Sequence, residues 1–239
     1  MPELNNDTIK IIQDLRSTWE IFYDNFIKKL FDFITQENDK IFFQYGRKAY
    51  WIDIENKNRL KSSSSIVEKI NKTIKKKPSA SNLKGFIEDC ILKLDDIARC
   101  RILCNYNSDM EKIDEKLKNK SDFDPVPFEY CEDKRKDKRI EAGLSFEKGA
   151  HRAIHEYFKM KRDEKVYYLE VQIMTSLQEA WDIKQHIIYE EIRKNVNHPE
   201  IKSIQDRFHA LSGLLMIADE FADKTWKKYI KEQNQHENL

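Results

Sequence analysis

The chain has 239 residues, which is enough for one large domain. Hydrophobic residues make up 40% and aromatic residues 11%, so a buried core can form, while 43 basic and 42 acidic side chains almost cancel. This balance excludes a strong global field that would attract DNA or a membrane surface, and neither is an expected partner.

The sequence has no feature of a membrane or secreted protein. It contains no run of about 18 apolar residues and does not open with the basic segment and apolar stretch of a signal peptide. The four cysteines have no C-x-x-C spacing, which argues against zinc, and Cys100 and Cys104 stand in an apolar stretch. We therefore expect reduced thiols and a cytoplasmic location.

The first part of the chain has mostly helical periodicity. A long helix is predicted over residues 6–35, with a buried stripe of Ile12, Leu15, Trp19, Phe22, Phe26 and Phe33. Residues 40–58 are mixed and predict either a strand or an irregular connection. Two shorter helices are expected at 62–76, where Pro78 follows, and at 83–92.

From residue 98 on, the pattern is that of strands interrupted by helices. Strands are expected at 98–106, 123–131, 151–160 and 166–175, and two prolines make the second of these an edge strand. Helices are expected at 108–118, from Ser176, and from Pro199 past Trp226, with Ser108 as a candidate N-cap.

The last helix is apolar on a wide arc, which includes Leu211, Leu214, Leu215, Ile217 and Phe221. Such an arc should be buried by other helices or by another subunit, and we expect a homo-oligomer. The element order predicts one α+β domain over residues 1–239, in which helices flank a mixed β-sheet. Its core should span about 40–193, with helical flanks at 1–39 and 199–232.

The segment Arg59–Lys69 has the composition of a phosphate site. It places basic and hydroxyl side chains where an extended segment enters a helix. A helix N-terminus presents unpaired N–H groups and partial positive charge, so phosphates bind there. The candidate phosphate ligands are Arg59, Lys61, Ser65 and Lys69.

Two isolated acids fall at or beside predicted strands. Alternation places Glu170 and Gln172 on the face of their strand opposite the core, where they would line a cleft. Asp96 precedes the strand that carries Arg101, and a carboxylate there, across from Glu170, could hold magnesium through its oxygens. Asp96 and Arg101 differ in parity, so Asp96 must lie outside the strand or at a bulge if both serve one site. A solvated sheet face and a surface ion pair are the alternatives.

Basic and histidine side chains point to further ligand contacts. His151 and His155 share parity in their predicted strand, so both can face the same cleft and contact phosphates, although a purely structural role is the alternative for each. The basic segment 134–139 is expected to be either a solvated loop or a contact for phosphates or an RNA backbone.

In this order, the segments resemble the synthetase domain of the RelA/SpoT family of (p)ppGpp synthetases, especially its short single-domain members. Residues 59–69 match the family's ATP-binding run of arginine, lysine, serine and lysine. Residues 96–101 match its Asp-Ile-Ala-x-x-Arg segment, and residues 170–175 its Glu-x-Gln-Ile-x-Thr strand. The resemblance implies a nucleotidyltransferase-like sheet.

The resemblance also implies roles for single residues. Asp96 and Glu170 would be the essential acids and would hold Mg²⁺, and Arg59 and Arg101 would flank the adenine of ATP. The acceptor side would consist of His151, His155 and Gln172; His155 and Gln172 keep the family's residues, whereas two other positions depart from them. The tyrosine that stacks on guanine in the family's Gly-Tyr-x-Ser-x-His motif is His151 here, and an arginine common after Gln-Ile is Met174.

From the resemblance we expect an enzyme that transfers the β,γ-diphosphate of ATP to the 3′-hydroxyl of GDP or GTP, as in the stringent response. Two alternatives remain open. Some short members of the family are toxins that pyrophosphorylate the 3′ end of tRNA, and an inactive nucleotide-binding regulator is the other alternative. Hydrolysis of ppGpp is not expected, since no His-Asp metal cluster precedes Arg59.

Overall fold

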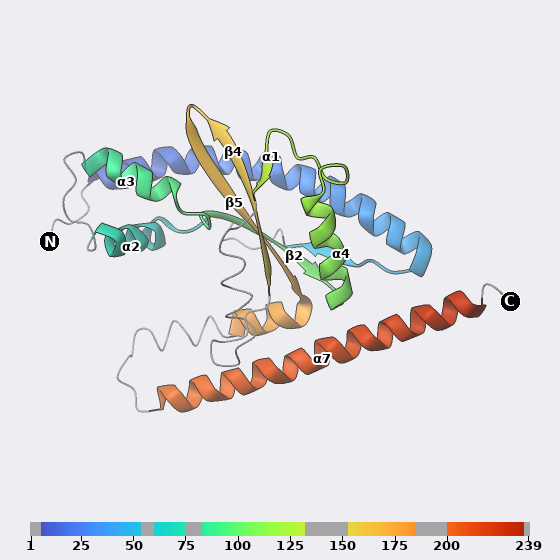
Figure 1. Cartoon of the computed structure of the whole chain (residues 1–239). Helices are drawn as coiled ribbons and strands as arrows, with labels where there is room; N and C mark the ends of the chain where they lie inside the picture. The colour runs from blue at the N-terminus through green and yellow to red at the C-terminus, as the bar shows by residue number, and fades with distance from the viewer. Residues whose placement is uncertain (1–5, 54–59, 75–82, 132–152, 185–199, 237–239) are drawn as a thin grey trace.

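The computed structural model describes residues 6–53, 60–74, 83–131, 153–184 and 200–236 (Figure 1). This part of the chain forms a five-stranded sheet in the order β1-β2-β5-β4-β3. The central pair β2 and β5 is parallel, whereas the other neighbouring strands are antiparallel. The strands are β1 (Tyr50–Ile52), β2 (Ala98–Cys104), β3 (Glu129–Cys131), β4 (Ile154–Arg162) and β5 (Lys165–Thr175).

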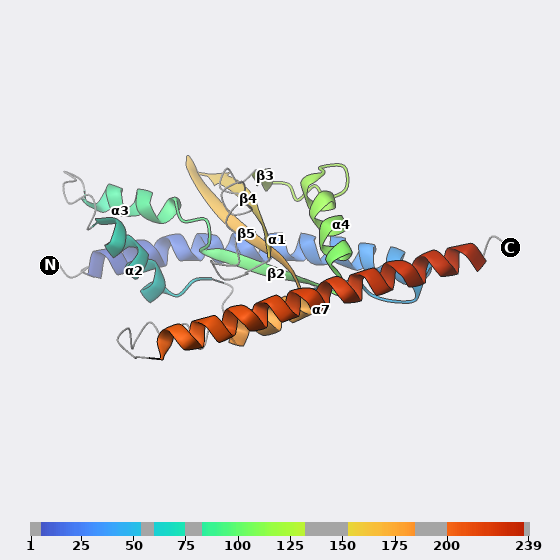
Figure 2. The ribbon, with the colours of Figure 1, turned by 60° about the horizontal axis from the view of Figure 1, so that its bottom comes forward.

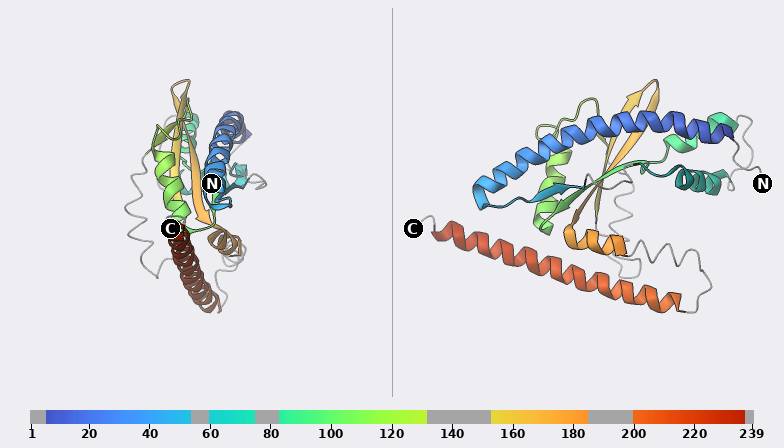
Figure 3. Two further views of the ribbon diagram at one scale, coloured as in Figure 1. Left: turned by 90° about the vertical axis from the view of Figure 1, so that its right-hand side faces the viewer. Right: turned by 180° about the vertical axis from the view of Figure 1, so that it is seen from behind.

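Helices surround this sheet, which confirms the predicted α+β class. They are α1 (Asn6–Tyr45), α2 (Ser63–Ile74), α3 (Leu83–Leu92), α4 (Asn107–Lys118), α7 (Ile201–His236) and the helical residues 176–184. The two long helices, α1 and α7, run along opposite sides of the molecule, with the sheet between them (Figure 3). Within the described residues, no helix is both long and apolar enough to span a membrane.

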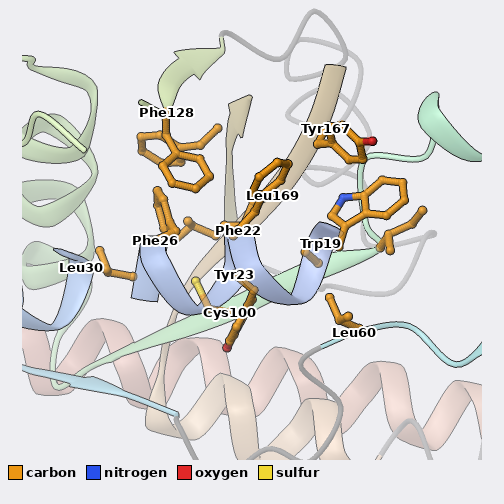
Figure 4. Packing of buried hydrophobic residues seen from close by; sticks show 14 of the residues in the cluster. Trp19, Phe22, Tyr23, Phe26, Leu30, Leu60, Cys100, Phe128, Tyr167 and Leu169 are labelled. Carbon is orange, nitrogen blue, oxygen red and sulfur yellow. The ribbon is translucent and has the colours of Figure 1, made fainter. Parts of the chain in front are cut away.

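The core lies between α1 and one face of the sheet. The buried stripe of α1 packs on apolar side chains of β2 and β5, which come from alternate strand positions (Figure 4). Aromatic rings dominate this contact: Phe26 lies edge-on to Phe128 at a centroid distance of 5.1 Å and tilted against Phe158 at 4.8 Å. Because this face is apolar, the polar residues at the alternate positions of β5 lie on the opposite face.

The hairpin between β4 and β5 fixes which residues lie side by side. Its two turn residues, Asp163 and Glu164, both have positive φ values, of 49° and 61°, as tight two-residue hairpins require. The resulting register pairs Tyr157 with Glu170 and His155 with Gln172. A shift by one residue would turn Glu170 into the core.

The structure corrects several predicted boundaries. The first helix continues to Tyr45, ten residues beyond the predicted end, and the edge strand near residue 123 is confined to Glu129–Cys131. The prediction of Ser108 as an N-cap is wrong, because α4 begins one residue earlier and Tyr106 holds the cap position without a side-chain hydrogen bond. The Ser108 N–H group instead donates to Oδ1 of Asp223.

Helix α7 crosses the molecule below the sheet (Figure 2). A hydrogen bond and an aromatic contact attach it to the rest of the chain. Thr175 at the end of β5 donates to Asp219 at 2.7 Å, and Trp226 stacks on Tyr106 at a centroid distance of 5.3 Å. The expectation that other helices bury its apolar arc is wrong for this chain alone, since Leu214, Ile217 and Phe221 are 61–72% exposed. Burial of this arc by another subunit stays a prediction.

Candidate functional site

The start of α2 has the geometry of a helix terminus with serine hydroxyls around it. Ser62 accepts a hydrogen bond from the Ser65 N–H group at 3.2 Å, and the two hydroxyl groups lie 2.9 Å apart. The preceding residue, Lys61, is fixed by a backbone hydrogen bond from its N–H group to Ile97, just before β2. The helix start is thus attached to the N-terminal end of a central strand.

Asp96 lies at this end of β2 and holds two lysines together. Its Oδ2 atom is 2.5 Å from Nζ of Lys61 and 2.5 Å from Nζ of Lys69. Burial by itself would raise the pKa of Asp96, but the two ammonium groups outweigh it and hold the pKa below its ordinary value. Burial and the neighbouring Lys69 lower the pKa of Lys61, although Asp96 acts in the opposite direction. Asp96 also lies just outside β2, as the parity of Arg101 required.

A second group forms around Glu170 in the middle of β5. The Oε1 atom of Glu170 lies 2.6 Å from Nδ1 of His155 and accepts a hydrogen bond from the Tyr157 hydroxyl at 3.0 Å. Burial alone would raise the pKa of Glu170, yet the contacts with His155 and Tyr157 hold it below its ordinary value. Because an ionised carboxylate can only accept, the hydrogen of this histidine lies on Nδ1. Glu170 is therefore a buried carboxylate whose hydrogen-bond partners favour its ionised form.

Gln172 links Glu170 to Arg101 on the neighbouring strand. Its amide nitrogen donates to Oε2 of Glu170 at 3.2 Å, and its carbonyl oxygen accepts from Nε of Arg101 at 3.1 Å. The guanidinium group of Arg101 also donates to Asp182 at 2.5 Å, in the helical residues 176–184. A continuous hydrogen-bonded chain thus runs from this helix through Arg101 to the carboxylate of Glu170.

The group around Asp96 and the group around Glu170 are neighbours. The negative charge of Asp96 is near enough to act on Glu170, where it opposes the lowering of the pKa. The two groups are carried by the adjacent parallel strands β2 and β5, whose register places Arg101 beside Gln172. The structure therefore brings together Lys61, Ser65, Lys69 and Asp96 on one side, and Arg101, His155, Glu170 and Gln172 on the other.

The two acids have the chemistry that Mg²⁺ prefers. In the described part of the chain, the buried Oδ1 atom of Asp96 has no hydrogen-bond partner, while its other oxygen is held by two lysines. The described residues hold no cluster of three or more acids, histidines or cysteines that would form a complete protein cage for a metal. Magnesium usually binds through one or two carboxylates together with substrate phosphates, so the donor set at Asp96 and Glu170 fits this ion.

Two of the predicted site residues, Arg59 and His151, lie outside the described residues, as does the basic segment 134–139. Sequence analysis missed two others that the structure adds. Tyr157 donates a hydrogen bond to Glu170. It could have been found from the sequence, because it stands two positions after His155 in the same strand and therefore lies on the same face. Asp182 holds Arg101, which no local pattern shows because the two are 81 residues apart.

The chain resembles known proteins in both sequence and structure. A family profile described as "Region found in RelA / SpoT proteins" matches residues 58–194. No curated protein matches. Among solved structures, small alarmone synthetase 2 from Bacillus subtilis is 21% identical with a TM-score of 0.55, and the match covers 87% of this chain and 97% of that one.

Two further structures share the fold. Small alarmone synthetase 1 from Bacillus subtilis is 18% identical with a TM-score of 0.56, and the match covers 90% of this chain and 98% of that one. A GTP pyrophosphokinase family protein from Streptococcus pneumoniae is 17% identical with a TM-score of 0.56, and the match covers 90% and 96%. At these identities the structures show a common fold, while the profile match over more than half of the sequence shows descent: the chain belongs to the RelA/SpoT family.

Proposed function

We propose that this protein is a pyrophosphokinase, which transfers the β,γ-diphosphate of ATP to the 3′-hydroxyl of GDP or GTP. The observation that carries the proposal is the ionised, buried Glu170, held by His155 and Tyr157 next to a lysine-bound Asp96. A pure nucleotide binder has little need for a base of this kind beside a second acid. The membership in the RelA/SpoT family supports the same reaction.

The donor nucleotide would bind at the start of α2. Lys61 and Lys69 present two ammonium groups there, and the hydroxyl group of Ser65 lies at the helix terminus with its unpaired N–H groups. Arg101 and Arg59 would flank the adenine, as the resemblance implies. The small alarmone synthetase 1 from Bacillus subtilis has been solved with AMPCPP, an ATP analogue, which supports an ATP site in this fold.

Glu170 would act on the acceptor. The 3′-oxygen attacks the β-phosphorus and forms the new O3′–P bond, while the bond from this phosphorus to the α,β-bridging oxygen breaks and AMP leaves. The proton of the hydroxyl group passes to Glu170, which is ionised and can accept it. The hydrogen bonds from His155 and Tyr157 keep the carboxylate in one orientation during this step.

Asp96 and Glu170 would hold the magnesium ion, which when bound supplies positive charge to the phosphate oxygens. Lys61 and Lys69 add fixed positive charge on the donor side, so the leaving AMP and the moving diphosphate remain neutralised. His151 would stack on the acceptor base and His155 would contact its phosphates. The same Bacillus subtilis synthetase has been solved with its product pppGpp, which supports a guanine nucleotide acceptor.

Incubation with ATP labelled at the γ-phosphate and with GDP, GTP or tRNA tests the proposal. Label in a guanine nucleotide, lost in the Glu170→Gln variant, would support it. Label in tRNA alone would show that tRNA is the acceptor and favour the toxin-type reaction. Label in neither acceptor would contradict transfer and favour a nucleotide-binding regulator.

A further inference from the structure

One arginine of the sheet has no assigned role. Arg99 stands in β2 between Ala98 and Cys100, which are both buried in the core with α1. Alternation therefore directs the Arg99 side chain to the opposite face, which carries Glu170 and Gln172. The parallel register places Arg99 directly beside Glu170, two positions before the pair of Arg101 and Gln172.

Among the described residues, three other cations near this face are already paired. Lys61 and Lys69 bind Asp96, and Arg101 binds Asp182. Arg99 is half-buried, and within the part of the chain that the structure describes it makes neither a hydrogen bond nor an ion pair. A partly desolvated guanidinium group that forms no ion pair is costly, and a contact with a ligand anion would offset that cost.

The position of Arg99 in the sheet indicates which ligand anion it would bind. Asp96, with its two lysines, comes three residues earlier, at the donor side of the site. Glu170, the proposed base, is the partner of Arg99 on the next strand. A diphosphate that moves from the donor to an acceptor oxygen near Glu170 must pass between Asp96 and Glu170. Among the cations that the structure describes, Arg99 is the one whose strand position lies between these two acids. The planar fork of a guanidinium group suits phosphate oxygens.

We propose that Arg99 is a substrate-binding residue that contacts the β,γ-diphosphate of the donor nucleotide. This inference rests on the proposed function, because it assumes a donor triphosphate at the start of α2. Arg99 would bind the part of the donor that is transferred, whereas other residues would bind the adenine and the α-phosphate.

Calorimetric binding of AMPCPP and of AMP tests the assignment without requiring turnover. AMPCPP carries the β,γ-diphosphate and cannot transfer it across its methylene bridge, while AMP lacks the diphosphate. The Arg99→Gln variant should bind AMPCPP at least about tenfold more weakly and AMP within about twofold of the wild type, as expected for one lost charged hydrogen bond. Arg99→Lys should have an intermediate affinity for AMPCPP, since it keeps the charge but not the fork.

Arg162→Gln is the matched control, because it removes the same charge from the hairpin end of β4, where Arg162 is half-exposed beside Asp163. It should bind both nucleotides as the wild type does. Arg99→Gln should melt at or above the wild-type temperature, because it removes a partly desolvated charge that has no partner among the described residues.

Three outcomes would overturn the inference. Unchanged AMPCPP affinity of Arg99→Gln, in a wild type that binds AMPCPP and transfers label, would refute the role of Arg99 and leave the proposed function intact. An equal loss of affinity for AMP and AMPCPP would show that Arg99 contacts the adenosine or the α-phosphate instead of the diphosphate. A wild type that does not bind AMPCPP would refute the proposed function and this inference together.

Discussion

The Nδ1 atom of His155 lies 2.6 Å from Oε1 of Glu170. The two residues are diagonal neighbours on the antiparallel strands β4 and β5, since His155 pairs with Gln172 and Glu170 with Tyr157. The carboxylate is thus held by the strand next to its own. Its orientation depends on the hairpin register rather than on a mobile loop.

This arrangement makes His155 and Tyr157 positioning residues for Glu170. His155→Ala should lower kcat by about 100-fold and Tyr157→Phe by about tenfold, since each loses one hydrogen bond to the base. Steady-state kinetics should show both losses in kcat, with the affinity for AMPCPP unchanged. Only His155→Ala should also raise the KM for the acceptor, because His155 would contact the acceptor phosphates as well. A loss confined to KM would contradict this assignment.

The lysine pair at Asp96 predicts a different effect on the donor side. Lys69→Ala should weaken the binding of AMPCPP by about tenfold, because a charged phosphate contact is lost. Lys61 still pairs with Asp96 in this variant, so the melting temperature should change little. Lys159→Ala, at a half-exposed pair with Glu129, is the control and should bind AMPCPP normally. Equal affinities for Lys69→Ala and the control would exclude the phosphate role.

The bridge through Gln172 predicts that donor and acceptor sides are coupled. Gln172→Leu keeps the size of the side chain but removes the donor to Glu170 and the acceptor for Arg101. We expect a loss of about 10- to 100-fold in kcat together with weaker AMPCPP binding, because both partners lose a hydrogen bond in a buried site. Binding calorimetry and kinetics on one preparation measure both effects. A variant in which only one of the two changed would show that the amide serves a single partner.

Glu37, which lies outside the candidate site, should make a pH-dependent contribution to the stability of the fold. Burial alone would raise its pKa, but ion pairs with Lys116 and Lys40 hold the pKa below the ordinary value of 4.5. A lowered carboxyl pKa stabilises the fold above the unfolded-state pKa, and this stabilisation disappears as pH falls through the folded-state pKa. Glu37→Gln should therefore cost about 1 kcal/mol at pH 7, a figure reduced for the exposure of the lysines.

Urea unfolding of both proteins from pH 7 into the acid range measures this difference, which should close as the pH falls through the lowered folded-state pKa of Glu37. A constant difference across this range would show that the loss comes from packing rather than from the charge of Glu37.

The aromatic contact between α1 and the sheet predicts a large loss of stability. Phe26 is fully buried among Phe123, Phe128 and Phe158, so Phe26→Ala should cost about 3–5 kcal/mol. Phe43, in the same helix but 89% exposed, is the matched control, and Phe43→Ala should change the free energy of unfolding by less than about 0.5 kcal/mol. Similar losses for the two variants in urea unfolding would contradict the packing of α1 on this face.

Most of the fold could be predicted because periodicity follows burial. The stripe of α1, the alternation of β5 and the bounds of α3 all repeat the pattern of side chains that face the core. The errors fall where this pattern ends. The last turns of α1 carry exposed aromatic residues such as Phe42 and Phe43, so no apolar period marks the true end at Tyr45.

For the candidate site, the sequence by itself predicted the lysine-serine run as the donor site and selected the two acids. A lysine-serine run before an amphipathic helix and an acid inside an apolar strand are local signals, and their chemistry can be read from residue type and spacing. The order of these segments also carried the family resemblance. The roles of these residues in transfer remain predictions, to be tested by the experiments above.

Only the tertiary structure decided how these residues are held. Lys61 and Lys69, before and within α2, meet at Asp96. Tyr157 binds Glu170, and Asp182 fixes Arg101. These contacts join residues 13 to 81 positions apart. Such pairings depend on strand order, hairpin register and the path of a helix past the sheet, and none of these leaves a periodic trace in the sequence. Local propensity selects helices and strands, whereas the long-range packing of the core sets which polar groups meet.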